Sequence, residues 1–218
     1  MNKGFLLLIS WVFLSAASPC FLVIHVDAPH LDYTSGQTLV HSLAKKGRFG
    51  HAWIYLQGYL DGELVYIEGG HSGELGTKRP TYFHGVMDAF ERGESNPIAY
   101  LWTSPQDGFF QIGPGKHKAT FSLKIEITQS EFLAMYSYIR PSNYSYAEYS
   151  LTGKQCCSFV AEVASFAGLQ LEHRVTVPVE PRMRFRGTCM RLWEDPAYST
   201  IMFSSVDRLE QSLKQLSN

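Results

Sequence analysis

The stretch Gly153-Lys-Gln-Cys-Cys-Ser-Phe-Val-Ala-Glu-Val-Ala164 decides the expected fold of this chain. Three apolar residues follow Cys156 at intervals of three, four and seven residues: Phe159, Val160 and Val163. This spacing places side chains on one face of a helix, so the stretch predicts an amphipathic helix beginning at Cys156. The first turn of a helix carries unpaired N–H groups and the positive end of the helix dipole, which favour a thiolate over a thiol. We therefore expect a nucleophilic sulfur at this position.

The length and composition are those of one folded domain, and the net charge does not favour nucleic-acid binding. The chain has 218 residues, of which 45% are hydrophobic and 18% are charged, and its formal net charge is −1. This length provides ample side chains for a core, and the hydrophobic and charged fractions exclude a disordered chain. The near-neutral balance gives no electrostatic reason to expect nucleic-acid binding.

The N-terminus has the pattern of an export signal. Lys3 precedes an apolar stretch at residues 5–14, which is followed by small residues suited to cleavage. The apolar stretch is too short to span a bilayer, and no other segment is long enough. We expect residues 1–18 to be a signal peptide and 19–218 to form a single exported domain, periplasmic or secreted, with no transmembrane segment. A lipid anchor through Cys20 is a minor alternative.

Four cysteines in an exported chain raise the question of disulfides. Cys20 with Cys189 is one conceivable bridge, and Cys157 with Cys189 is another. The sequence does not choose between them.

The periodicity predicts an α+β fold with an antiparallel sheet, because helices and strands are segregated along the chain. The Asp61-Gly62 pair is a strong hairpin signal between two of the strands, and Thr128 begins a capping box. A segment rich in glycine, proline and aromatic residues, 71–115, is expected to form long loops with one strand-like run at 98–102. The expected strands are 21–26, 50–58, 63–68, 118–127 and 175–179, and the expected helices are 35–46, 128–139, 156–168 and 206–216.

A cysteine nucleophile needs a base within hydrogen-bond reach and a group that orients this base. His51 is the candidate base, because it begins the aromatic strand directly after Gly50 and shares one strand face with Trp53. Glu68, near the end of the return strand, is the candidate orienting group, which would fix the tautomer of the imidazole. His71, three residues further on, is the alternative.

Two motifs carry a resemblance to a known family. The run Gly50-His51-x-Trp53-Ile54 on a strand, followed by Cys156-x-x-Phe159-Val160 opening a helix, resembles the NlpC/P60 papain-like superfamily. The histidine precedes the cysteine by 105 residues, which is the circularly permuted order of the lecithin:retinol acyltransferase-like branch. The resemblance implies a papain-like cysteine hydrolase fold, with an antiparallel sheet packed on the helix that carries the cysteine.

The resemblance also implies acyl transfer through a thioester. Cys156 would attack a carbonyl while His51 holds and returns the proton, and the helix amides together with the Gln155 side chain would stabilise the oxyanion. Related sequences commonly have Asn or Asp where Gln155 stands. The doubled cysteine leaves open whether Cys156 or Cys157 is the nucleophile, and the spacing to Phe159 favours Cys156. No cofactor or metal is expected.

Family substrates are peptidoglycan cross-bridge amides, other amides and lipid esters, and the export signal favours cell-wall peptides. The alternatives are a lipid acyltransferase or thioesterase of the same fold and a non-catalytic secreted binding protein. A metal hydrolase is a further alternative, although no metal-binding motif spacing is present. Its ligands would be drawn from His51, Glu68, His71 and His84.

Overall fold

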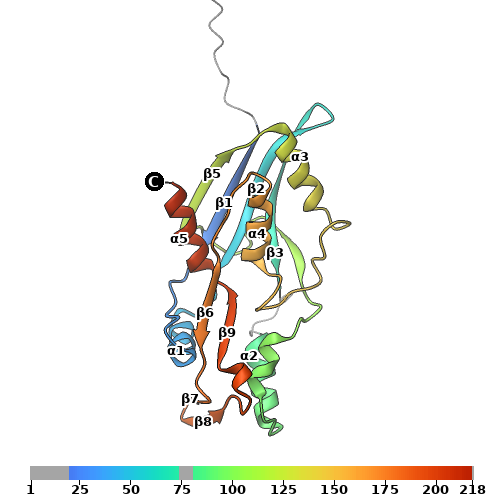
Figure 1. Cartoon of the computed structure of the whole chain (residues 1–218). Coiled ribbons are helices and arrows are strands. Elements are labelled where there is room, and N and C mark those ends of the chain that lie inside the picture. The colour runs from blue at the N-terminus through green and yellow to red at the C-terminus, as the bar shows by residue number, and fades with distance from the viewer. Residues whose placement is uncertain (1–19, 74–80, 218) are drawn as a thin grey trace, which may run out of the picture.

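The computed structural model describes residues 20–73 and 81–217 and confirms the α+β class. The predicted signal peptide, 1–18, lies outside the described residues. Figure 1 shows a central antiparallel sheet with the strand order β4-β3-β2-β1-β5. Its strands are β1 (Phe21–Asp27), β2 (His51–Leu60), β3 (Glu63–Ser72), β4 (Phe109–Ile112) and β5 (Phe121–Glu126).

One face of this sheet forms the main core. In β2, Ala52, Ile54 and Leu56 belong to this core and are fully buried. Three helices pack against this face and contribute Phe132, Phe159 and Leu209 to the same cluster. These helices are α3 (Gln129–Tyr138), α4 (Cys156–Ser165) and α5 (Val206–Leu216). The helix that carries the paired cysteines therefore packs on the antiparallel sheet.

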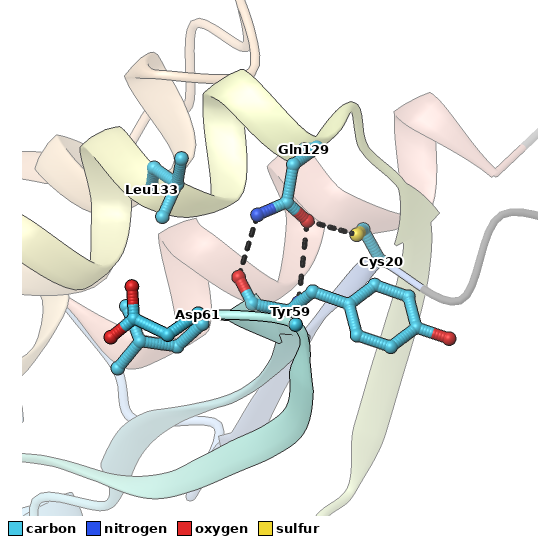
Figure 2. Close-up of a pocket in the computed structure, with 7 residues that line it drawn as sticks. Cys20, Tyr59, Asp61, Gln129 and Leu133 are labelled. Atoms are coloured by element: carbon cyan, nitrogen blue, oxygen red, sulfur yellow. Dashed lines mark hydrogen bonds between the residues drawn. The ribbon is translucent and has the colours of Figure 1, made fainter.

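The hairpin that joins β2 to β3 is held against α3. Asp61 and Gly62 adopt φ angles of 51° and 85°, the left-handed pair that a two-residue hairpin turn requires. Gln129 Nε2 donates to the Tyr59 carbonyl at 2.6 Å, and Gln129 Oε1 accepts from the Cys20 thiol at 3.1 Å (Figure 2). A hollow of about 470 Å³ lies here, at the opposite end of β2 from His51.

A second hydrophobic cluster lies at the other end of the molecule, with Val177, Ile201 and Phe203 among its buried members. Figure 1 shows α1 (Gly36–Lys46), α2 (Thr81–Glu91) and the small strands gathered there, away from the β2–β3 hairpin. None of the described helices is long and apolar enough to cross a membrane. The remaining elements are the 3₁₀ helices η1 (Pro97–Trp102) and η2 (Pro196–Tyr198) and the strand pairs β6 (Arg174–Pro178) with β9 (Thr200–Ser204) and β7 (Arg182–Phe185) with β8 (Thr188–Arg191).

The prediction of long loops over 71–115 is wrong, because this segment contains α2, η1 and β4. The physical reason lies in a tertiary contact at Gly85, within α2. A Cβ atom at this position would lie 2.0 Å from the ring of Tyr100, which belongs to η1. The glycine that weakens the helix signal in the sequence therefore permits close packing of α2 on η1.

The structure contains neither of the two conceivable disulfides, because all four cysteines are free. Cys20 is buried beside Gln129 at the hairpin end of the sheet, whereas Cys189 is exposed on β8. Cys157 is fully buried at the start of α4. Neither conceivable bridge is formed, because Cys189 lies outside the core in which the other two thiols are buried.

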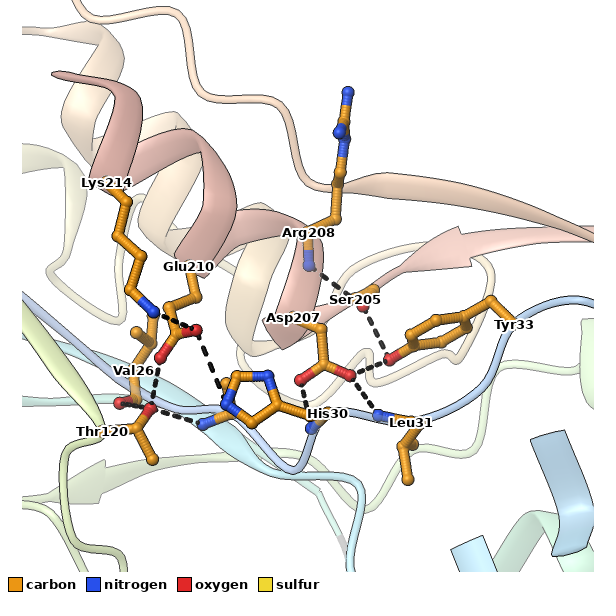
Figure 3. Close-up of polar contacts among 11 residues, drawn as sticks. Val26, His30, Leu31, Tyr33, Thr120, Ser205, Asp207, Arg208, Glu210 and Lys214 are labelled. Carbon is orange, nitrogen blue, oxygen red and sulfur yellow. Dashed lines mark hydrogen bonds and ion pairs between the residues drawn. The ribbon is translucent and has the colours of Figure 1, made fainter. Parts of the chain in front are cut away.

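Asp207 ties the start of α5 to the segment that follows β1 (Figure 3). Its carboxylate is 5% exposed and accepts three hydrogen bonds. The donors are the His30 amide at 2.8 Å, the Leu31 amide at 2.7 Å and the Tyr33 hydroxyl at 2.8 Å. The negative charge also lies in the first turn of α5, where the helix dipole stabilises it.

We expect Asp207→Ala to lower the free energy of unfolding by about 3 kcal/mol, because it leaves three donors, among them the buried Leu31 amide, without their carboxylate acceptor. Chemical denaturation monitored by circular dichroism measures this change. Asp88→Ala, which removes an exposed carboxylate from α2, is the control and should change stability by less than about 0.5 kcal/mol. Equal effects of the two substitutions would contradict this account of Asp207.

Candidate active site

The paired cysteines lie at the start of α4, as the sequence predicts. Gln155 is the residue before the helix, and Cys156 is its first residue. Phe159 and Val160 are fully buried and fix this face of the helix against the sheet. As a result Cys156 is 4% exposed and Cys157 is inaccessible to solvent.

His51 is the first residue of β2, and its position depends on Gly50. Gly50 has a φ of 85°, and a Cβ atom there would lie 2.3 Å from the carbonyl oxygen of Asp27. Only glycine allows the chain to enter β2 this close to the end of β1. The His51 side chain is 4% exposed and stacks on Trp53, with ring centroids 6.0 Å apart.

The structure brings Cys156 and His51 together, and the surroundings of Cys156 favour its thiolate. The largest effect on Cys156 is the hydrogen bond with Cys157, whose Sγ lies 3.9 Å away and which lowers the pKa of Cys156. The His51 imidazole and the Ala52 amide lower the pKa further, and together these contacts outweigh burial. The pKa of Cys156 is therefore well below that of an ordinary thiol.

The neighbouring thiol behaves in the opposite way. Burial, with the hydrogen bond to Cys156, raises the pKa of Cys157 well above its ordinary value. Cys157 thus stays protonated and donates its S–H to Cys156. Of the two sulfurs that the sequence leaves open, the geometry favours Cys156 as the nucleophile.

Glu68 does not lie with this pair. Its Oε1 accepts a hydrogen bond from Trp53 Nε1 at 3.1 Å. In the β2–β3 ladder its partner is Tyr55, four residues beyond His51, which corresponds to roughly 13 Å along a strand. In the described structure Glu68 orients the Trp53 indole, and no hydrogen bond joins it to His51.

His71, the alternative orienting group, is fully buried and has both ring nitrogens engaged. Nε2 lies 2.8 Å from the Tyr146 carbonyl oxygen, which accepts only, so Nε2 carries the proton. Nδ1 lies 2.9 Å from the Tyr144 hydroxyl and accepts from it. Burial lowers the pKa of His71, which keeps the imidazole neutral. Neither nitrogen is left to hold His51.

Gln155 does not fill the role that the resemblance implies. Its Nε2 group has two protons, and they are donated to the carbonyl oxygens of Leu151 and Ser204, each at 3.0 Å. Its Oε1 lies 3.7 Å from Cys156 Sγ. The side chain therefore anchors the start of α4, and its Nε2 group has no proton left for an oxyanion.

Three residues that sequence reasoning missed surround His51. The His117 ring lies 4.7 Å from the His51 ring, and its Nδ1 is 2.9 Å from Asp27 Oδ2. Arg48 Nη1 lies 2.6 Å from the same oxygen. The ladder between β1 and β2 places Asp27 directly opposite His51. Pairing the two predicted strands in this register would have identified Asp27 as a neighbour of His51 from the sequence.

Known proteins add no assignment to this geometry. No protein-family model, curated protein or solved structure matches the chain. Within residues 20–73 and 81–217, no group of three or more His, Cys, Asp or Glu side chains is arranged to hold a metal ion. The site is therefore interpreted from its own chemistry.

Subtracting the ultraviolet absorbance of Cys156→Ser from that of the wild type isolates the titration of the Cys156 thiol. We expect its midpoint to lie below the usual thiol pKa of about 8.5, because the contacts of Cys156 stabilise its thiolate. Adding Cys157→Ala to both chains removes the main hydrogen-bond donor and should move this titration to higher pH. The titration is followed at the thiolate absorbance band. An unchanged midpoint after Cys157→Ala would contradict the assigned role of Cys157.

Proposed function

We propose that this protein is a cysteine hydrolase of the circularly permuted papain-like type, which cleaves amide bonds through a thioester on Cys156. The observation that carries the proposal is the contact between a thiol of lowered pKa at a helix start and the buried imidazole of His51. A nucleophile and a base within reach of each other are the minimum that this chemistry needs.

In the first half of the reaction the Cys156 thiolate attacks the substrate carbonyl carbon. The N–H groups at the start of α4 stabilise the negative oxygen of the tetrahedral intermediate, where the helix dipole also favours charge. His51, which holds the proton taken from the thiol, gives it to the leaving amine as the C–N bond breaks. The product is an acyl thioester on Cys156 and a free amine.

In the second half a water molecule attacks the thioester carbon. His51 accepts a proton from this water, the C–S bond breaks and the sulfur leaves as a thiolate. The carboxylic acid is released, and the thiolate and imidazolium are restored. In both halves the groups that act on the reacting atoms are Cys156, His51 and the helix amides.

The architecture supports this assignment. The cysteine helix packs on an antiparallel sheet, the histidine begins a strand of this sheet, and the histidine precedes the cysteine in the chain. These are the features that the resemblance to the permuted NlpC/P60 superfamily implies. The free thiol of Cys156 also favours an enzyme over a non-catalytic secreted protein with structural cysteines.

The proposed substrates are peptide amides, with cell-wall peptides first because of the predicted export signal. A lipid acyltransferase or thioesterase would use the same Cys156 and His51, since both reactions pass through an acyl-cysteine. The two functions differ in the leaving group and in the acyl acceptor, and a substrate panel separates them.

We expect peptidoglycan cross-bridge peptides to be cleaved, with kcat/KM falling at least about 10³-fold in Cys156→Ala and in His51→Ala. The measurement is release of a new amine, compared with release of acid from fatty-acyl esters under the same conditions. Cys157→Ala keeps the nucleophile and is the matched control, which should retain more activity than Cys156→Ala.

Turnover of acyl esters but not of peptides would replace the amidase with the acyltransferase alternative. Activity that survives in Cys156→Ala would contradict both functions, because neither mechanism proceeds without this sulfur.

A further inference from the structure

We infer that Asp27 is the positioning residue of this site, with its Oδ1 accepting a hydrogen bond from His51 Nε2–H while His51 Nδ1 faces the Cys156 sulfur. The catalytic consequence of this contact rests on the proposed function. The contact itself is a statement about the protein and can be tested without any substrate.

Asp27 and His51 each have a buried polar side-chain atom without a hydrogen-bond partner in the part of the chain that the structure describes. Buried side-chain nitrogen and oxygen atoms are almost always hydrogen-bonded, and an exception calls for an explanation. Among the described residues, two such atoms have no partner, and they are Asp27 Oδ1 and His51 Nε2. One is an acceptor, and the other becomes a donor in the tautomer that carries its proton on Nε2. A single hydrogen bond between them would satisfy both atoms.

The two residues are also neighbours in the sheet. Asp27 is the last residue of β1 and His51 is the first residue of β2, and they are directly opposed in the antiparallel ladder. Opposed residues project from the same face of a sheet, with Cβ atoms about 5 Å apart. The side chains of Asp27 and His51 are therefore neighbours on one face of the sheet.

The other oxygen of Asp27 is held in place. Arg48 Nη1 and His117 Nδ1 bind Oδ2 at 2.6 Å and 2.9 Å, and the Asp27 residue is fully buried. The His117 ring packs against the His51 ring with centroids 4.7 Å apart, so His117 touches both the Asp27 carboxylate and the His51 imidazole. Arg48 and His117 thus engage Oδ2 and leave Oδ1 for His51.

The other two candidates are already committed. Glu68 accepts from Trp53, and both nitrogens of His71 are bonded to tyrosines 144 and 146. Asp27, in contrast, has an oxygen beside His51, Oδ1, that accepts no hydrogen bond in the described structure. A carboxylate in this position holds the imidazole in one tautomer and orientation, and stabilises the imidazolium that forms during the reaction.

The tautomer is measured by nitrogen-15 NMR of histidine-labelled full-length protein carrying Cys156→Ala, which removes the sulfur beside the ring. We expect neutral His51 to carry its proton on Nε2, with a downfield and slowly exchanging N–H resonance. The same resonance should be lost when Asp27→Asn is added. A His51 proton on Nδ1 in the chain that retains Asp27 would overturn the inference, whether or not the Asp27 variant folds.

The kinetic test compares Asp27→Asn with Glu68→Gln, a matched loss of one nearby carboxylate. We expect Asp27→Asn to lower kcat by about 10²–10⁴-fold with little change in KM, since loss of the correct tautomer acts on the chemical step. Glu68→Gln should lower kcat by less than about tenfold, because Glu68 orients only Trp53. An unchanged kcat in folded Asp27→Asn overturns the inference.

The two proposals fail in different ways. A wild-type protein without hydrolase activity, in which His51 still carries its proton on Nε2 opposite Asp27, would end the proposed function and uphold the contact. An active protein in which Asp27→Asn and the wild type have the same kcat would uphold the hydrolase and end the role of Asp27.

Discussion

The antiparallel pairing of β1 with β2 is the constraint on which the rest of this site depends. It places Asp27 opposite His51, and it buries Ala52, Ile54 and Leu56 on the face that receives α4. A shift of one residue in this register would turn every side chain of β2 to the other face. The core and the site are therefore fixed by the same ladder.

The site itself depends on a division of roles between two adjacent sulfurs. Cys156 is at the helix start, next to His51, and its thiolate is favoured, whereas Cys157 is buried and its pKa is raised. The two are coupled because the protonated sulfur donates to the charged one. Sequence reasoning treats the second cysteine as a competitor for the role of nucleophile. The structure instead makes it the principal hydrogen-bond donor to the first.

Local signals predicted much of the fold, and tertiary contacts account for the rest. The capping box at Thr128, the Asp61-Gly62 turn and the helix at Cys156 were predictable because each depends on neighbours within a few residues. The helix at α2 was missed because Gly85 is explained only by the distant Tyr100 ring. The pairing of Cys156 with His51 was predictable from motifs. The surroundings of His51 were not, because they depend on which strands pair and on His117, 66 residues further along the chain.

The central claim is that one sulfur of the pair is a nucleophile activated by its surroundings. Limiting iodoacetamide at mildly acidic pH, followed by peptide fragmentation that separates Cys156 from Cys157, tests this claim most directly. The account predicts that Cys156 is alkylated first, ahead of the exposed Cys189, because its surroundings lower its pKa and favour the thiolate. Alkylation of Cys157 or Cys189 while Cys156 remains unmodified would contradict it.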